Sequence, residues 1–303
     1  MTGYRLVNYA ALDGARAGLL IDGQVHDVAA LTGRDGPVRI MDVLTAWEAW
    51  KPLLAAARPG AEGLPLAAVT LHAPLGAPAQ VYCAGANYRD HADAMAKANG
   101  TPLGPDPKEA GLKAWFFMKG VRALADPGAT VALPPGARKV DWEAELAVVI
   151  GRTARQVPAA RALDHVMGYA IGNDLSARDL GHRPGVPATS PFAMDWLAHK
   201  SFDGALPFGP WITPAAAVPA PQDLPIQLWV NETLRQDSNT RAMIFDIAEQ
   251  IAHLSEKLTL YPGDVILTGT PAGTGNESQI FLAPGDVIRI RIGALGELVT
   301  SMG

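Results

Sequence analysis

The sequence predicts a strand-rich α+β protein, in which an antiparallel or mixed sheet closes on itself and a small α+β unit precedes it. Three observations predict this class. Apolar runs of strand length recur along the chain and are bounded by Pro, Gly and Asp turns. Helical apolar stripes are few, with the clearest at about 40–57 and 243–256. Hydrophobic residues make up 49% of the 303 residues and charged residues 18%, which is a globular composition.

Charge and cysteine content narrow the class of protein. The net charge is −5 and the Lys and Arg residues are scattered, which argues against nucleic acid or an anionic membrane as a partner. The single cysteine, Cys83, excludes a disulfide within the chain and favours a reducing compartment. No apolar run approaches the roughly 20 residues of a membrane span, and the first residues lack the apolar segment of a signal peptide. We therefore expect a cytoplasmic protein.

The first part of the chain predicts a small domain over residues 1–75. Asp22-Gly23 is a strong signal for a two-residue hairpin turn between two apolar runs. A helix is expected at about 40–57, and the Pro-, Gly- and Ala-rich residues 58–80 are expected to form a linker. The short strands expected here are at 5–7, 17–21 and 25–28.

The main domain is expected over residues 76–303. It opens with a strand at 80–85, and the polar segment 87–113 has the composition of a lid with a short helix at about 90–98. Helices are also expected at 158–166 and 243–256. The further strands expected are at 114–118, 129–133, 142–150, 167–173, 226–230, 264–268 and 286–292.

The stretch from Lys139 to Ile150 is the most informative, because it places three carboxylates on one side of a predicted strand. Strand side chains alternate between faces, so Asp141, Glu143 and Glu145 share one face and apolar residues share the other. Neighbouring carboxylates repel each other unless water or a cation neutralises them. Oxygen ligands without imidazole or thiolate select Mg²⁺, Mn²⁺ or Ca²⁺. A solvated acidic strand face is the alternative that this strand alone leaves open.

Several ordered motifs carry a family resemblance. They are Cys83-Ala84-Gly85-Ala86-Asn87-Tyr88-Arg89-Asp90-His91, Asp141-Trp142-Glu143-Ala144-Glu145-Leu146, Asn173-Asp174-Leu175-Ser176-Ala177-Arg178-Asp179, Lys200-Ser201-Phe202-Asp203 and Leu267-Thr268-Gly269-Thr270-Pro271-Ala272-Gly273. Together they resemble the signature blocks of the fumarylacetoacetate hydrolase superfamily over about residues 80–303. The similarity is to the branch that holds acylpyruvate hydrolases and 2-hydroxyhepta-2,4-diene-1,7-dioate isomerases.

The resemblance implies roles for particular residues. Glu143, Glu145 and Asp174 would hold one Mg²⁺ or Mn²⁺, and Ca²⁺ could take their place in a crystal. Lys200 would face the substrate and is assigned to catalysis. The residues assigned to substrate binding are Arg178, Thr270, Gly269 and Tyr88. The implied fold is a mixed β-roll or sandwich with a small N-terminal domain, usually assembled as a homodimer.

The chemistry that these residues imply is stabilisation of an enolate. A small 2-oxo or 1,3-dicarbonyl acid can chelate a metal through two oxygens, and the metal then acts as a Lewis acid. Hydrolysis also needs a base, for which His91 is the candidate. Hydrolases of the family carry His-x-x-Glu here, but this chain has Ala94 in place of the glutamate. Asp93 is next to that position and is kept as a catalytic candidate that could orient His91.

Two enzyme functions therefore stay open. The first is a Mg²⁺- or Mn²⁺-dependent hydrolase that cleaves a C–C bond in an acylpyruvate-type acid through a metal-chelated enolate. The second is an isomerase, tautomerase or decarboxylase of a related acid, of the oxaloacetate or hydroxyheptadienedioate type, which Ala94 favours. A metal-bound scaffold without catalysis is the weakest alternative, because the chain has Lys200, Arg178 and Thr270 at the positions of the family's substrate-facing residues. Gly181 stands where many family members have Gln, which predicts a different mode of substrate recognition.

Overall fold

The computed structural model describes residues 3–58, 63–77, 79–98, 100, 102 and 104–303. The N-terminal part contains the predicted hairpin, and both of its turn residues have positive φ, 46° at Asp22 and 79° at Gly23, as this turn requires. The predicted helix is two helices that meet at Ala46, whose φ of −117° departs from helical geometry. The elements are β1 Arg5–Ala11, β2 Gly14–Ile21, β3 Gln24–Asp27, α1 Val28–Thr32, α2 Ile40–Thr45, α3 Trp47–Ala56, β4 Leu64–Pro65 and β5 Leu71–His72.

The prediction that residues 58–80 form a linker is wrong for part of this range, because it contains β4 and β5. β4 pairs with β3, and β5 pairs with β1, so these residues add edges to the N-terminal sheet. Two-residue strands carry too little hydrophobic alternation to stand out in the sequence, and the sheet edge supplies their hydrogen bonds. Residues 59–62 and 78 lie outside the described residues.

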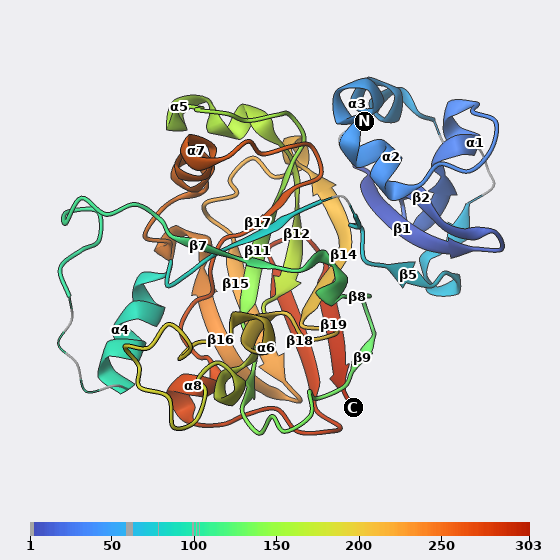
Figure 1. Cartoon of the computed structure of the whole chain (residues 1–303). Coiled ribbons are helices and arrows are strands. Elements are labelled where there is room, and N and C mark those ends of the chain that lie inside the picture. The colour runs from blue at the N-terminus through green and yellow to red at the C-terminus, as the bar shows by residue number, and fades with distance from the viewer. Residues whose placement is uncertain (1–2, 59–62, 78, 99, 101, 103) are drawn as a thin grey trace.

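A long mixed sheet forms the middle of the molecule (Figure 1). Its order is β4-β3-β2-β1-β14-β12-β11-β17-β6-β7, in which β17 and β6 are parallel and the other neighbours are antiparallel. Because β1 pairs with β14, the N-terminal strands continue this sheet, and the domain boundary at 75/76 stays a prediction. The central strands are β6 Val81–Ala84, β7 Phe116–Lys119, β11 Ala144–Ile150, β12 Val166–Asn173, β14 Leu206–Pro214 and β17 Val265–Leu267.

A second sheet packs against the first and closes the main core. Its order is β16-β15-β18-β19-β9, and Leu228 and Ile290 from this sheet share one hydrophobic cluster with Leu146 and Ile171 of the first. This arrangement confirms the strand-rich α+β class. Its strands are β9 Thr130–Val131, β15 Pro225–Val230, β16 Thr233–Asn239, β18 Val287–Ile292 and β19 Glu297–Met302, and the short strands β8 Leu124–Ala125, β10 Val140–Asp141 and β13 Ser176–Ala177 lie outside it.

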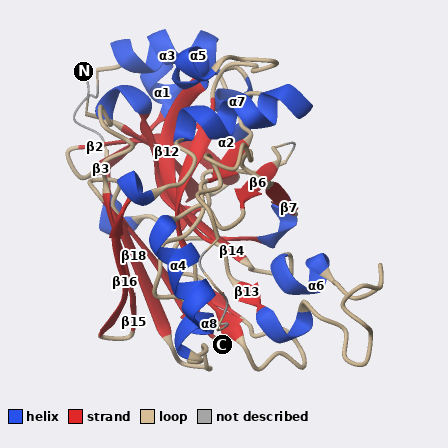
Figure 2. Ribbon diagram, turned by 90° about the vertical axis from the view of Figure 1, so that its left-hand side faces the viewer, coloured by secondary structure: helices blue, strands red, loops and turns tan. Residues whose placement is uncertain are grey.

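The helices gather at two ends of the sheets (Figure 2). One end carries α5 Ala159–Ala162 and α7 Ile247–Lys257 together with α1, α2 and α3, and the other carries α4 Arg89–Ala98, α6 Trp196–Lys200 and α8 Gly275–Ser278. The helix predicted at 243–256 begins at Ile247, because Asp246 caps it in a capping box with Glu249. Among the described residues, none of the helices is long and apolar enough to cross a membrane.

Trp142 is the largest fully buried side chain of the core, and it lies in the break between β10 and β11. Its ring N–H donates to the carbonyl of Gly273 at 3.0 Å. Replacement of Trp142 by Ala leaves a cavity and an unpaired carbonyl, so we expect the free energy of unfolding to fall by about 3–5 kcal/mol. Urea denaturation measures this change. Leu12→Ala is the control, because Leu12 is fully exposed and its loss should leave the stability unchanged; equal stability of both variants would contradict the packing described.

Candidate metal centre

The sequence predicted one continuous acidic strand, but the structure has two strands here. The break lies at Trp142 and Glu143, between β10 and β11. The backbone N–H of Glu143 donates to Asn173 Oδ1 at 3.0 Å, and that of Ala144 donates to Gln236 Oε1 at 2.9 Å. Side chains thus replace the ladder at this point. Asp141 therefore lies on β10, apart from the strand β11 that carries Glu145, and it shares Arg178 with Glu143.

Glu143, Glu145 and Asp174 come together at the ends of two neighbouring strands. The antiparallel pairing of β11 with β12 places Ala144 opposite Asn173, which brings Asp174 beside the two glutamates. One ligand atom from each of the three carboxylates lies within 4.8 Å of the others, and all three residues are buried. Three buried carboxylates at this spacing suit a hard divalent cation such as Mg²⁺ or Mn²⁺.

Two buried lysines contact the same carboxylates. Lys200, the last residue of α6, lies with Nζ 2.8 Å from both Glu143 Oε2 and Asp174 Oδ2. Lys119, the last residue of β7, contacts the Asp174 carboxylate and donates to the carbonyl of Leu175 at 2.9 Å. Lys119 was not among the site residues predicted from the sequence. The only signal for it was a lysine at the end of the apolar run Phe116-Phe117-Met118.

The electrostatics single out Glu145. Burial raises its pKa well above the usual range, and the charges of Asp174 and Glu143 raise it further. Burial would also raise the pKa of Glu143, but Lys200 and Arg178 outweigh it and hold that pKa low. Four buried carboxylates, with Asp141 as the fourth, face three cations, Lys119, Lys200 and Arg178. The surplus negative charge is the feature that a divalent cation would offset.

Asp141 has a structural task beside this centre. It accepts backbone N–H groups of Gly275 at 2.5 Å and Asn276 at 3.0 Å at the start of α8. It also accepts Arg178 Nε at 2.9 Å, and Arg178 reaches on to the Glu143 carboxylate. A Cβ at Gly275 would lie 2.7 Å from Asp141 Oδ1, so glycine is needed there. Asp141 therefore positions Arg178 and α8.

Gly269, Thr270 and Tyr88 lie around Glu145 in different ways. The Gly269 N–H donates to Glu145 Oε2 at 2.6 Å from a backbone with φ of 95°, which favours glycine. Thr270 Oγ1 accepts from Gln236 Nε2 at 2.8 Å and lines the cavity above the carboxylates. Tyr88 is fully buried and its hydroxyl has no hydrogen-bond partner among the described residues. Burial first, and then the charge of Glu145, raise the pKa of Tyr88 well above its ordinary value.

His91 lines the same cavity and has a carboxylate partner that the sequence did not indicate. Its Nδ1 lies 2.5 Å from Oε1 of Glu277, which belongs to α8, and the other oxygen of Glu277 accepts the Gly273 N–H at 2.7 Å. Asp93 is exposed on α4, so the structure brings Glu277 to the ring instead. No local pattern could have shown this, because 186 residues separate His91 from Glu277.

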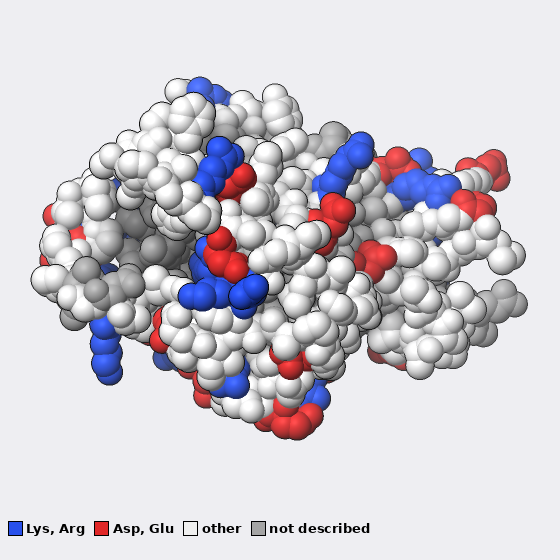
Figure 3. Space-filling view, turned by 60° about the horizontal axis from the view of Figure 1, so that its bottom comes forward, with Lys and Arg blue, Asp and Glu red and all other residues white. Residues whose placement is uncertain are grey.

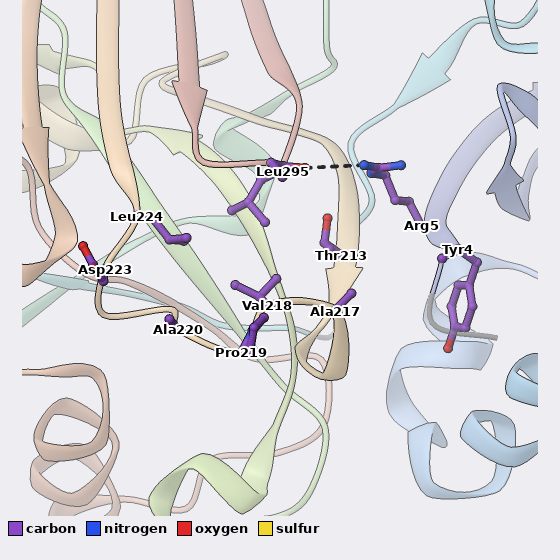
Figure 4. A pocket seen from close by; sticks show the side chains of 12 residues that line it. Tyr4, Arg5, Thr213, Ala217, Val218, Pro219, Ala220, Asp223, Leu224 and Leu295 are labelled. Carbon is purple, nitrogen blue, oxygen red and sulfur yellow. Dashed lines mark hydrogen bonds between the residues drawn. The ribbon is translucent and has the colours of Figure 1, made fainter.

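The cavity that holds these groups has a volume of about 140 Å³ and is not the largest of the molecule. A cavity of about 400 Å³ lies where the N-terminal residues meet the main domain, and Val218, Leu224 and Leu295 line it (Figure 4). Its rim carries Arg5, which donates to the carbonyl of Ala294 at 3.5 Å. None of the clustered carboxylates lines this larger cavity, so chemistry rather than volume marks the site.

Charged side chains outside the site are dispersed on the face that Figure 3 shows. Basic and acidic groups are interspersed there, with broad uncharged areas between them. By contrast with this face, buried carboxylates and lysines meet inside the cavity.

A family model and several known proteins are similar to this chain over most of its length. The family model described as "Fumarylacetoacetate (FAA) hydrolase C-terminal" matches residues 80–302. A bovine protein named oxaloacetate tautomerase FAHD2B, mitochondrial, is 38% identical over 243 residues, which are 79% of this chain and 71% of that protein. The crystal structure of maleylpyruvate hydrolase from Sphingobium sp. SYK-6 in complex with manganese(II) ion and pyruvate is similar, with a TM-score of 0.75, 34% identity and 98% of each chain covered. That of 2-hydroxyhepta-2,4-diene-1,7-dioate isomerase from Mycobacterium marinum has a TM-score of 0.70 and 30% identity, over 99% of this chain and 98% of that one.

Proposed function

The chain belongs to the fumarylacetoacetate hydrolase family, and from this premise we propose that it is a Mg²⁺- or Mn²⁺-dependent hydrolase that cleaves a C–C bond in acylpyruvate-type 2,4-dioxo acids. The observation that carries the proposal is the contact of 2.5 Å between His91 and Glu277. Hydrolysis needs an oriented base that activates water, whereas tautomerisation needs a base only for the C3 proton and uses no water. His91, oriented by Glu277, supplies that base, even though Ala94 stands where hydrolases of the family have a glutamate.

Glu143, Glu145 and Asp174 would hold the metal ion in this proposal. A bound Mg²⁺ or Mn²⁺ would supply Lewis-acid stabilisation of the negative charge that develops when a chelated 2-oxo acid loses its acyl group. Lys200 lies beside two of these carboxylates and would add positive charge next to the substrate. A relative with manganese and pyruvate in its crystal structure supports this choice of metal and ligand class.

His91 would act as the general base. A carboxylate oxygen can only accept, so the Nδ1 that faces Glu277 carries the ring proton and Nε2 is left as the acceptor. Nε2 takes a proton from water, and the oxygen adds to the C4 carbonyl carbon of the 2,4-dioxo acid. The C3–C4 bond then breaks, its electron pair stays on C3, and C3 takes up a proton. One water is consumed, and pyruvate and one carboxylic acid are formed.

Arg178 and Thr270 keep the substrate-binding role that the family resemblance implied, whereas Gly269 and Tyr88, which were given the same role, are not among the residues that line the cavity. Arg178 and Thr270 line the cavity and can reach polar groups of a ligand. Gly269 and Tyr88 lie beneath it, beside Glu145, and would act on the ligand through that carboxylate. The homodimer and the cytoplasmic location stay predictions.

A tautomerase of a 2-oxo acid such as oxaloacetate is the second candidate. The bovine relative at 38% identity, which is named an oxaloacetate tautomerase, favours it. Tautomerisation moves one proton between carbon and oxygen and consumes no water. The buried Lys119 and Lys200 would stabilise the enolate in this reaction as well as in hydrolysis.

Product analysis distinguishes the two candidates. Acetylpyruvate incubated with the Mn²⁺-loaded protein should give pyruvate and acetate in equal amounts. Proton NMR measures both products. Removal of the metal with a chelator should stop the reaction, because the carboxylates then have no cation to share with the substrate. Interconversion of enol and keto forms of oxaloacetate, with no cleavage of acetylpyruvate, would contradict the hydrolase and support the tautomerase.

A further inference from the structure

The cavity of about 400 Å³ where β1 meets the main domain takes no part in the metal centre (Figure 4). Its volume lies in the range of about 300–1,000 Å³ that is typical of small-molecule sites. Most of its wall is apolar, with Val218 and Leu295 on opposite sides and Leu224 beside them. Arg5 and Asp223 are the charged residues of the described lining. An apolar cavity with few polar groups suits a ligand that is itself mostly apolar.

Arg5 and Thr213 lie next to each other in the wall of this cavity. β1 and β14 are antiparallel and Leu6 lies opposite Ile212, so the next pair along the two strands is Arg5 and Thr213. The side chains of such a pair point to the same face of the sheet, and Figure 4 shows both on the same side of the cavity. The Arg5 guanidinium lies over the ring of Trp211, 5.3 Å from its centroid. The ring therefore holds the cation at the cavity wall.

Both polar groups have donors that are not used within the protein. Thr213 is 5% exposed, and its hydroxyl has no hydrogen-bond partner among the described residues. The buried Nε of Arg5 has none among them either, and its Nη2 donates to the carbonyl of Ala294 at 3.5 Å, which is a long contact. Asp223 pairs with Arg241 at 2.9 Å and lies on the opposite side of the cavity from Arg5 (Figure 4). Because buried polar groups are nearly always paired, these donors indicate a ligand that accepts hydrogen bonds.

We propose that this cavity is a second binding site, which takes a small monocarboxylic acid with a ring-sized apolar body. The carboxylate would accept from the Arg5 guanidinium and the Thr213 hydroxyl, and a planar guanidinium suits a carboxylate well. The apolar body would fill the space between Val218, Leu224 and Leu295. This site goes beyond the proposed function, since none of the three metal-binding carboxylates lines it.

The charges of the lining separate this ligand from the substrate of the metal centre. A 2-oxo acid would bind at the metal centre by chelation, whereas a single carboxylate beside Arg5 is enough for this cavity. A second carboxylate at the other end of the ligand would meet Asp223 and be repelled. A monocarboxylate should therefore bind better than a dicarboxylate or a neutral amide of the same shape.

The probe is 3-phenylpropionate, whose ring and single carboxylate match this class. Titrations followed by saturation-transfer NMR give its affinity for the Mg²⁺-loaded protein, and a ligand of this size should bind in the millimolar range or more tightly. Arg5→Gln removes the charge and should weaken binding at least about tenfold. Thr213→Val keeps the shape but loses the hydroxyl, and should weaken binding about two- to tenfold. 3-Phenylpropanamide lacks the charge and should bind the wild type at least about tenfold more weakly.

Glu145→Gln is the control for the metal centre, which also attracts carboxylates. It should bind 3-phenylpropionate as the wild type does. Loss of binding in Glu145→Gln, or binding of wild-type strength in Arg5→Gln, would overturn the proposal. An amide that binds as tightly as the acid, or a wild type that does not bind the acid at millimolar concentrations, would do the same. Thermal unfolding without ligand shows whether each variant is folded, and the comparison of acid with amide needs no variant at all.

Discussion

Glu145→Gln will abolish tight binding of Mn²⁺ and, with it, all activity on 2-oxo acids. The amide has the same shape, but it removes the carboxylate whose charge is least compensated in the cluster. Glu145 has the Gly269 N–H at 2.6 Å as a partner, whereas Glu143 and Asp174 contact lysine. Isothermal titration should show the Mn²⁺ affinity falling by more than about a hundredfold, since losses of that order follow even from changes behind metal ligands.

The same variant should remain folded. Because burial and the neighbouring Asp174 and Glu143 raise the pKa of Glu145 in the folded protein, its ionised form costs stability above the pKa of the unfolded chain. Gln carries no charge, so the melting temperature of the metal-free protein should not fall. Glu232→Gln is the matched control, because Glu232 is exposed and far from the cluster in sequence. Mn²⁺ binding of wild-type strength in Glu145→Gln would remove Glu145 from the metal site.

His91→Ala will lower the rate of acetylpyruvate hydrolysis by about 10²–10⁴, the range that a general base contributes. Glu277→Gln should cause a smaller loss, because the ring remains but its Nδ1 proton is no longer held by a carboxylate. Metal binding should be retained in both variants. Steady-state kinetics at fixed Mn²⁺ measure the effect, and it should fall on kcat more than on KM.

Asp93→Asn is the control for this pair. Asp93 is the acidic residue that the sequence placed next to the expected position, and it is exposed on α4. Its replacement should leave hydrolysis unchanged. A full rate in Glu277→Gln together with a large loss in Asp93→Asn would show that Asp93, rather than Glu277, orients His91.

Much of the fold could be predicted where local chemistry decides it. Asp22-Gly23 specified a hairpin, and the stripe at Ile247, Ile251 and Leu254 specified α7. β14 was not predicted because it contains Pro207, Pro210 and Pro214, and proline is normally excluded from a central strand. β16 was missed because most of its side chains are polar. In both strands, pairing with neighbours outweighs the local preference.

Only some residues of the site could be predicted from the sequence. Glu143 and Glu145 are two residues apart, so the local pattern pointed to both, whereas Asp174, just after β12, was assigned only through the family resemblance. Lys119 and Glu277 come from segments distant in the chain, and the sheet and the helix α8 bring them in. Ala94 cannot hydrogen-bond to His91, and only the three-dimensional structure shows that Glu277 does so instead.

Hydrolysis in water enriched in the heavy oxygen isotope tests the central claim most directly. If Glu277 and His91 activate water for attack on the C4 carbonyl, acetate formed from acetylpyruvate will carry one oxygen from the solvent, and His91→Ala will form labelled acetate far more slowly. Mass spectrometry reads the label. Absence of acetate, with exchange of the C3 protons as the only change, would contradict the hydrolase and show that the site stops at the enolate.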